Sequence, residues 1–168
     1  MKSKKIIILR SVLLTLIFLW CALIFFMSAE TADISSNRSE GLSEKIIGFF
    51  LSVFNLEGEQ RLELVETFET FLRKGAHMFS YFVLSVLSLS FAFTFDRIKT
   101  YARVLSSLAF SLVYALSDEI HQLYVEGRSG SFRDVLIDMT GAFLGALAVL
   151  AVCYIKTRKK KKGSQQIT

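Results

Sequence analysis

Four stretches of about twenty mostly apolar residues divide the chain: residues 6–27, 76–95, 104–125 and 135–155. Each is long enough, as an α-helix, to cross the roughly 30 Å hydrocarbon layer of a membrane. The chain has no proline, so no segment is forced to lose a backbone hydrogen bond where water cannot replace it. Hydrophobic residues make up 52% of the chain, more than a small soluble core needs. The sequence therefore predicts an all-α membrane protein with a four-helix transmembrane bundle.

The basic residues predict how these helices are oriented, because positive residues near membrane ends stay on the cytoplasmic side. With the amino terminus inside, 13 of the 20 basic residues fall in cytoplasmic pieces: Lys2, Lys4, Lys5, Arg10, Arg97, Lys99, Arg103, Lys156, Arg158, Lys159, Lys160, Lys161 and Lys162. Every acidic residue except Asp96 falls on or near the outer side. We therefore expect both termini in the cytoplasm. The basic charge is a membrane signal, since no aromatic residues interleave with it as they would in a nucleic-acid site.

The predicted domain organisation is simple. Residues 1–155 form one transmembrane domain, and residues 156–168 form a basic cytoplasmic tail. We expect the first span to be retained as an anchor, because no small-x-small cleavage site follows it. Between the first two spans, apolar residues recur at helical spacing from Leu42 onward, which is typical of an amphipathic helix lying at the outer membrane interface. A second helix is expected to run from there straight into the second span.

Polar residues interrupt the third predicted span near its outer end. Ionisable residues are costly inside a bilayer and normally face a cavity or one another. Asp118, His121 and Gln122 are spaced i, i+3, i+4, which places them on one face of the helix, with Glu119 beside them. This spacing predicts a polar cluster at the outer boundary of the membrane.

The neighbouring helices carry matching residues. Asp134 and Asp138 lie one turn apart at the outer start of the fourth span, and Gly141 and Gly145 continue the stripe. A G-x-x-x-G edge lets another helix approach closely, so it predicts that both aspartates point into the bundle. The second span places further polar groups at the same outer depth, one turn apart, and the loop before the fourth span adds a cation: Arg73, His77, Tyr81 and Arg128.

We predict acid–base or orienting roles for four of these residues: Asp118, His121, Asp134 and Asp138. Ligand-binding roles are predicted for five others: His77, Tyr81, Glu119, Gln122 and Arg128. A histidine one turn from a carboxylate suits proton transfer, and arginine holds a phosphate or carboxylate through two parallel hydrogen bonds. An anionic head group is the favoured ligand.

Alternative interpretations apply to several positions. An acid at a helix amino terminus, such as Asp134, is favoured by the helix dipole alone and can pair with Arg133 as a structural lock. Arg73 and Lys74 fit a role as interface anchors. Ser129 and Ser131 have the chemistry of nucleophiles, but serine beside glycine is first of all a turn residue. The carboxylates suit a divalent metal, yet their spacing matches no dedicated metal motif, so no metal site is predicted, and the sequence leaves the cofactor unknown.

Two sequence blocks resemble a known family. The central one comprises Ser117-Asp118-Glu119-Ile120-His121-Gln122-Leu123-Tyr124, Gly127-Arg128-Ser129-Gly130-Ser131-Phe132-Arg133-Asp134-Val135 and Asp138-Met139-Thr140-Gly141; the upstream one is Arg73-Lys74-Gly75-Ala76-His77. Both are similar to motifs of the VanZ-like family, and the resemblance covers residues 14–148. It implies a protein of the bacterial plasma membrane, linked through a family member to low-level resistance to the glycopeptide teicoplanin in Gram-positive bacteria. At Ala29-Glu30 many relatives have serine and glutamine.

Two functions fit these observations. One is an enzyme that acts at the outer leaflet on a lipid, lipid-linked or cell-wall group. The other is a non-catalytic protein that binds a lipid head group, or the lipid tail of an antibiotic, in the same polar site. A transporter or a partner-protein scaffold is less favoured, because few polar residues continue into the cytoplasmic halves of the second and fourth spans. The sequence names neither a substrate nor an oligomeric state.

Overall fold

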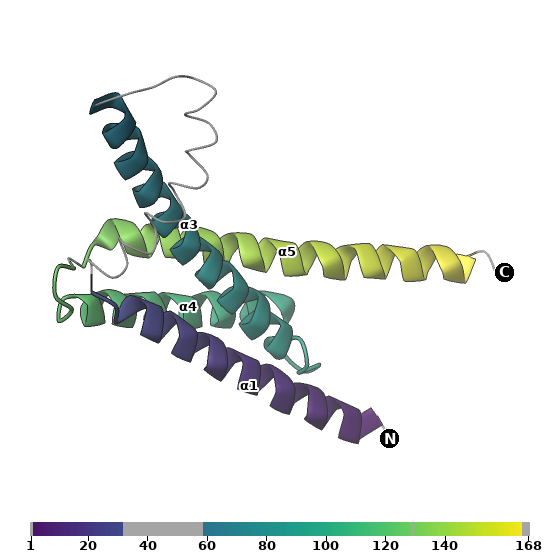
Figure 1. Ribbon diagram of the computed structural model, residues 1–168. Coiled ribbons are helices and arrows are strands. Elements are labelled where there is room, and N and C mark those ends of the chain that lie inside the picture. Colours follow the sequence, from purple (N-terminus) through teal and green to yellow (C-terminus); the bar gives the residue numbers. More distant parts are fainter. Residues whose placement is uncertain (1, 32–58, 129, 166–168) are drawn as a thin grey trace.

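The computed structural model describes residues 2–31, 59–128 and 130–165 of the chain. Within these ranges it forms four α-helices and no strand: α1 (Lys2–Ser28), α3 (Glu59–Ala92), α4 (Thr100–Gln122) and α5 (Phe132–Gln165) (Figure 1). The prediction of an all-α fold is therefore confirmed. The amphipathic helix predicted to begin near Leu42 lies outside the described residues.

Three of the helices are long and apolar enough to cross a membrane, over Lys4–Ser28, Thr67–Ala92 and Phe132–Lys159. They correspond to the first, second and fourth predicted spans. α4 is not among them, because Arg103, Asp118 and Glu119 and several serines lower the hydropathy of its 23 residues. The third span stays a prediction.

The helix ends differ from the predicted spans in three places. α3 begins at Glu59 and passes without a break into the membrane-length segment, as expected, but it ends at Ala92 rather than at Phe95. α4 ends at Gln122, because the next two amides bond carbonyls only three residues back and Gly127 then reverses the chain at a φ of 74°. α5 continues through the predicted tail as far as Gln165.

The tightest packing in the bundle is between α3 and α5, which run in the same direction. A Cβ atom added at Gly141 would collide with the carbonyl of Met78, and one added at Gly145 would collide with the carbonyl of Phe82. Only glycine permits this approach of two backbones. The predicted role of the glycine stripe is therefore confirmed, and it turns the start of α5 toward the bundle.

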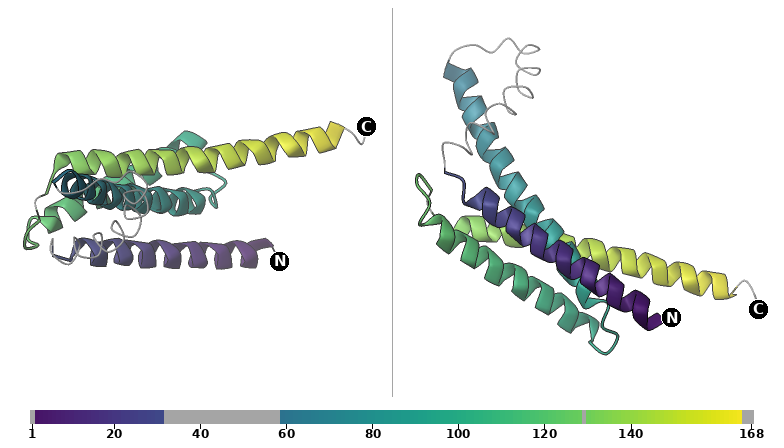
Figure 2. Two further views of the ribbon diagram at one scale, coloured as in Figure 1. Left: turned by 45° about the horizontal axis from the view of Figure 1, so that its top comes forward. Right: turned by 60° about the horizontal axis from the view of Figure 1, so that its bottom comes forward.

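α1 lies on the opposite side of α3 from α5, and it contacts α3 and α4 but not α5 (Figure 2). Two hydrogen bonds from side chains to backbone carbonyls hold α1 to its neighbours, one to α3 and one to α4. The Trp20 indole donates to the Ser80 carbonyl at 2.9 Å, and the Tyr114 hydroxyl donates to the Cys21 carbonyl at 2.6 Å. Ile17 and Ile24 fill the core between these contacts.

The bundle has two distinct ends. At the one called here the loop end, residues 123–131 connect α4 to α5 and α1 finishes at Ser28 (Figure 1). At the other, called the termini end, the described chain begins and ends and residues 93–99 connect α3 to α4. The polar residues singled out by the sequence gather at the loop end.

Candidate functional site

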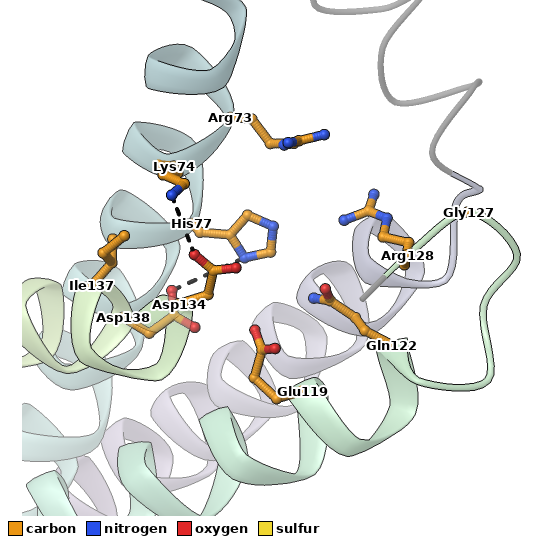
Figure 3. Close-up of a pocket in the computed structure, with 10 residues that line it drawn as sticks. All are labelled: Arg73, Lys74, His77, Glu119, Gln122, Gly127, Arg128, Asp134, Ile137 and Asp138. Atoms are coloured by element: carbon orange, nitrogen blue, oxygen red, sulfur yellow. Dashed lines mark ion pairs between the residues drawn. The ribbon is translucent and has the colours of Figure 1, made fainter. Parts of the chain in front are cut away.

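A cavity of about 130 Å³ opens at the loop end between α3, α4 and α5. Side chains from these three helices and from the α4–α5 connection point into it (Figure 3). Its lining consists of Arg73, Lys74, His77, Glu119, Gln122, Gly127, Arg128, Asp134, Ile137 and Asp138. Eight of these ten residues are polar or charged, so the cavity suits a polar ligand.

The floor of the cavity is formed by Asp138. This residue is 0% exposed, and neither of its carboxylate oxygens accepts a hydrogen bond from any described residue. It lies one turn before Gly141, whose contact with α3 brings this part of α5 close to His77. The His77 Nδ1 atom is 4.0 Å from the nearer Asp138 oxygen (Figure 3). A buried carboxylate without a hydrogen-bond partner is expensive, which makes Asp138 a candidate functional residue.

The rim of the cavity carries two guanidinium groups, Arg73 from α3 and Arg128 from the connection (Figure 3). Arg128 is tied to the end of α1, because its Nε atom donates to the Glu30 carbonyl at 3.0 Å. Burial lowers the pKa of Arg128, and the positive charge of Arg73 lowers it further. The two cations therefore lie close enough to repel each other, an arrangement that an anion placed between them would stabilise.

The remaining polar side chains on the cavity wall make contacts within the protein. Lys74 and Asp134 form an ion pair at 3.7 Å, with both side chains partly exposed. Glu119 accepts a hydrogen bond from the Ser131 amide at 2.7 Å, which fixes the start of α5 against the end of α4. Gln122 donates to the Ser28 hydroxyl at 2.9 Å and to Asp118 at 3.3 Å, which joins α1 to α4.

Of the nine site residues predicted from the sequence, six line the cavity and three do not: Asp118, His121 and Tyr81. Asp118 is buried behind Gln122. The His121 ring stacks on Phe25 with centroids 4.6 Å apart. Tyr81 is 0% exposed and packs in the core. The histidine beside the floor carboxylate Asp138 is His77.

Two cavity residues were interpreted differently from the sequence. Arg73 and Lys74 line the cavity, although their position suggested interface anchors. The sequence did indicate that Arg73 shares a helix face with His77, since it lies one turn before His77 on the same helix. Ser131 immediately precedes α5, where its hydroxyl accepts a bond from the Arg133 amide, and Ser129 lies outside the described residues. Among the residues that the structure describes, no group of three His, Cys, Asp or Glu is placed to hold a metal ion.

Three membrane-length helices, together with a charged cavity between α3, α4 and α5, define a helical protein of membrane-spanning character with a buried polar site. A sequence model of the VanZ/LLP1 family matches residues 13–154. The chain therefore belongs to the VanZ/LLP1 family. Comparison with curated proteins and with solved structures gives no match.

Proposed function

We propose that this protein binds the anionic head group of a lipid, or of a lipid-linked cell-envelope molecule, and carries out acid–base chemistry on it at the outer face of the bacterial plasma membrane. The single observation that carries the proposal is the floor of the cavity. Asp138 is fully buried, neither of its oxygens accepts a hydrogen bond from a described residue, and His77 lies beside it under two cationic side chains.

The proposed orientation has four spans with both termini in the cytoplasm. α4 serves as the third span, because its 23 residues at 1.5 Å per residue reach about 35 Å. Both termini and the α3–α4 connection lie at one end of the bundle, and this end carries most of the basic residues (Figure 1). Positive residues favour the cytoplasmic side, so the loop end with its cavity faces outward.

In this proposal the rim arginines hold the anion. A guanidinium group has five N–H donors in a fixed fork that matches a phosphate or a carboxylate. Arg128 uses its Nε atom on the Glu30 carbonyl, which leaves its two terminal nitrogens on the cavity side (Figure 3). The cavity volume of about 130 Å³ admits a head group, while the apolar part of the molecule stays in the surrounding membrane.

The chemical step is assigned to His77 and Asp138. The Asp138 carboxylate accepts no hydrogen bond from a described residue, so both of its oxygens are available to accept a proton. His77 is within 4.0 Å of it and also lines the cavity, so the pair can accept a proton from a bound group and return it. Asp134, held by Lys74, keeps the start of α5 in place against α3.

A second candidate function is binding without chemistry, for example of the lipid tail or head group of a glycopeptide antibiotic. The contacts of Glu119, Gln122 and Lys74 favour it, since these side chains build a rigid wall rather than a reactive one. Either function would connect the protein to teicoplanin resistance, the first by altering an envelope lipid and the second by retaining the drug.

The test is teicoplanin susceptibility of a sensitive Gram-positive host that expresses the intact protein, Asp138→Asn or His77→Gln. Asp138→Asn keeps the size of the side chain but removes the carboxylate, so we expect susceptibility to return to the host baseline. Asp96→Asn is the matched control, because Asp96 is exposed in the α3–α4 connection, far from the cavity. Immunoblots of membranes establish equal protein levels.

Two further variants separate the candidate functions. His121→Ala removes the other histidine, which stacks on Phe25 away from the cavity, and we expect a smaller loss than from His77→Gln. Arg73→Gln should abolish resistance under both functions when the ligand is held by an anionic head group. Resistance retained by Asp138→Asn but lost by Arg73→Gln would leave binding as the function. Resistance retained by all of these variants would contradict the site itself.

A further inference from the structure

A second cavity, of about 320 Å³, lies in the termini half of the bundle between α1, α3 and α4. This volume is at the lower end of the roughly 300–1,000 Å³ of ligand cavities. Large apolar side chains form most of its lining: Leu14, Ile17, Phe91, Phe95, Ile98 and Phe110. It is separate from the polar cavity, because the bonds of Trp20 to Ser80 and of Tyr114 to Cys21 close the bundle between the two.

Small residues create the space in this second cavity. Ser88 of α3 and Ser107 of α4 face each other with their hydroxyl oxygens 2.6 Å apart, which brings these two helices together. Ala92 follows one turn after Ser88 and also lines the cavity. Leu14 and Ile17 of α1 also line the cavity, and Ile17 is the more buried of the two, being 9% exposed where Leu14 is 57% exposed.

Two half-buried arginines stand at the termini side of this cavity. Arg10 lies one turn before Leu14 on α1, and its guanidinium group covers the Phe95 ring at 4.0 Å. Arg103 lies one turn before Ser107 on α4, and its guanidinium group lies 4.9 Å from the centre of the Phe93 ring.

Both arginines bond the end of α3 and keep donors beyond those bonds. Arg10 donates to the Thr94 hydroxyl at 3.1 Å and to the Thr94 carbonyl at 2.7 Å, and Arg103 donates to the Phe95 carbonyl at 2.7 Å. Each guanidinium has five N–H groups, so donors remain on both. The buried Nε of Arg103 has no partner among the described residues. Two cations at the mouth of an apolar cavity match a ligand with an anionic head and a hydrocarbon chain.

We propose that this cavity binds one acyl chain of an anionic phospholipid, whose phosphate lies against Arg10 and Arg103. The chain enters from the termini end and follows the apolar lining toward Ile17. The net positive charge around the mouth favours an anionic lipid over a neutral one. The exposed residues there include Arg97 and Lys99 and a single acid, Asp96. The assignment of this lipid to the cytoplasmic leaflet rests on the orientation proposed above. The binding site itself does not.

A tryptophan reporter tests the proposal, since the chain has only one native tryptophan. In a Trp20→Phe background, Phe91→Trp places the reporter on the cavity wall. Tyr154→Trp is the matched control. Tyr154 is 59% exposed on α5 and does not line this cavity. Full-length protein in neutral detergent micelles is titrated with dibrominated phosphatidylglycerol or dibrominated phosphatidylcholine.

We expect half-quenching of the Phe91→Trp reporter to need about tenfold less dibrominated phosphatidylglycerol than dibrominated phosphatidylcholine. The Tyr154→Trp reporter should respond equally to both lipids. Arg10→Gln with Arg103→Gln should remove the preference, whereas Arg97→Gln should keep it. Because the arginine variants also lose bonds to α3, Ala92→Phe provides an independent test: it fills the cavity without changing charge and should reduce quenching to the level of the control reporter.

Equal quenching of the Phe91→Trp reporter by both lipids would overturn the proposal, and so would an unchanged response in Ala92→Phe. Circular dichroism and size-exclusion chromatography show which variants are folded. The result is independent of teicoplanin susceptibility, so failure of the lipid site and failure of the proposed outer-face function can be told apart.

Discussion

The two ends of the bundle use buried charge in opposite ways. At the termini end, Arg10 donates to the Thr94 carbonyl and Arg103 to the Phe95 carbonyl, both in the connection that follows α3. At the loop end, Asp138 has no hydrogen-bond partner among the described residues although three helices surround it. Charge that completes the backbone stabilises the fold, whereas charge that is left unpaired lowers stability and remains available to a ligand.

The largest expected effect comes from breaking the contact that builds the loop end. Gly141→Leu would drive a side chain into the Met78 carbonyl, separate α5 from α3 and dismantle the His77–Asp138 pair. We expect a loss of about 3 kcal/mol or more in the free energy of unfolding, from overpacking. Unfolding in mixed detergent micelles, followed by circular dichroism, measures it.

The control for this substitution is Gly75→Ala on α3. No atom lies within 4 Å of the Cβ position at Gly75, and the residue sits inside a helix. Alanine should therefore raise the free energy of unfolding by up to about 1 kcal/mol. If both glycine substitutions had the same effect, the close approach of α3 and α5 would not be what positions the site.

A smaller loss in the free energy of unfolding is expected from substitutions at the termini end. Arg10→Gln combined with Arg103→Gln removes three hydrogen bonds from charged donors to the end of α3. We expect the free energy of unfolding to fall by about 2 kcal/mol, because partial exposure reduces what each bond contributes. The same micelle unfolding assay measures it, with Arg97→Gln as the control, since Arg97 is exposed. If the double variant left the free energy of unfolding unchanged, the contrast between the two ends would be removed.

The smallest expected change in the free energy of unfolding is a gain rather than a loss. Asp138→Asn replaces a buried, unpaired carboxylate with a neutral amide of the same size. We expect the unfolding free energy to rise by about 1 kcal/mol while resistance is lost, since the cost of burying the charge disappears. Thermal unfolding of purified protein in detergent tests the sign. Destabilisation would mean that the Asp138 carboxylate is a structural partner after all.

Much of this fold follows from residue patterns that one helix can show by itself. The apolar runs predicted the three membrane-length helices, and the spacing of Gly141 and Gly145 predicted which side of α5 is packed. The helix ends were less predictable. α3 stops at Ala92 because Arg10 and Arg103, distant in sequence, bond the carbonyls that follow it.

The site shows the same limit. Spacing placed Asp118, His121 and Gln122 on one face of α4, but which of them reaches the cavity depends on α1. Phe25 stacks on His121 and Ser28 bonds Gln122, so one of these residues is drawn away and one is fixed at the wall. A single-helix pattern contains no information about such contacts. His77 and Arg73 shared a visible stripe on α3, yet only the position of α5 shows that this stripe faces Asp138.

The pairing of α3 with α5 also sets the order of assembly during synthesis. Met78 and Gly141 are 63 residues apart, and α4 must be made between them. While the ribosome is still producing α4, His77 has no carboxylate beside it, and the charged groups of α3 face lipid or water. The cavity therefore forms only when α5 packs on α3, so a chain truncated before α5 would lack it.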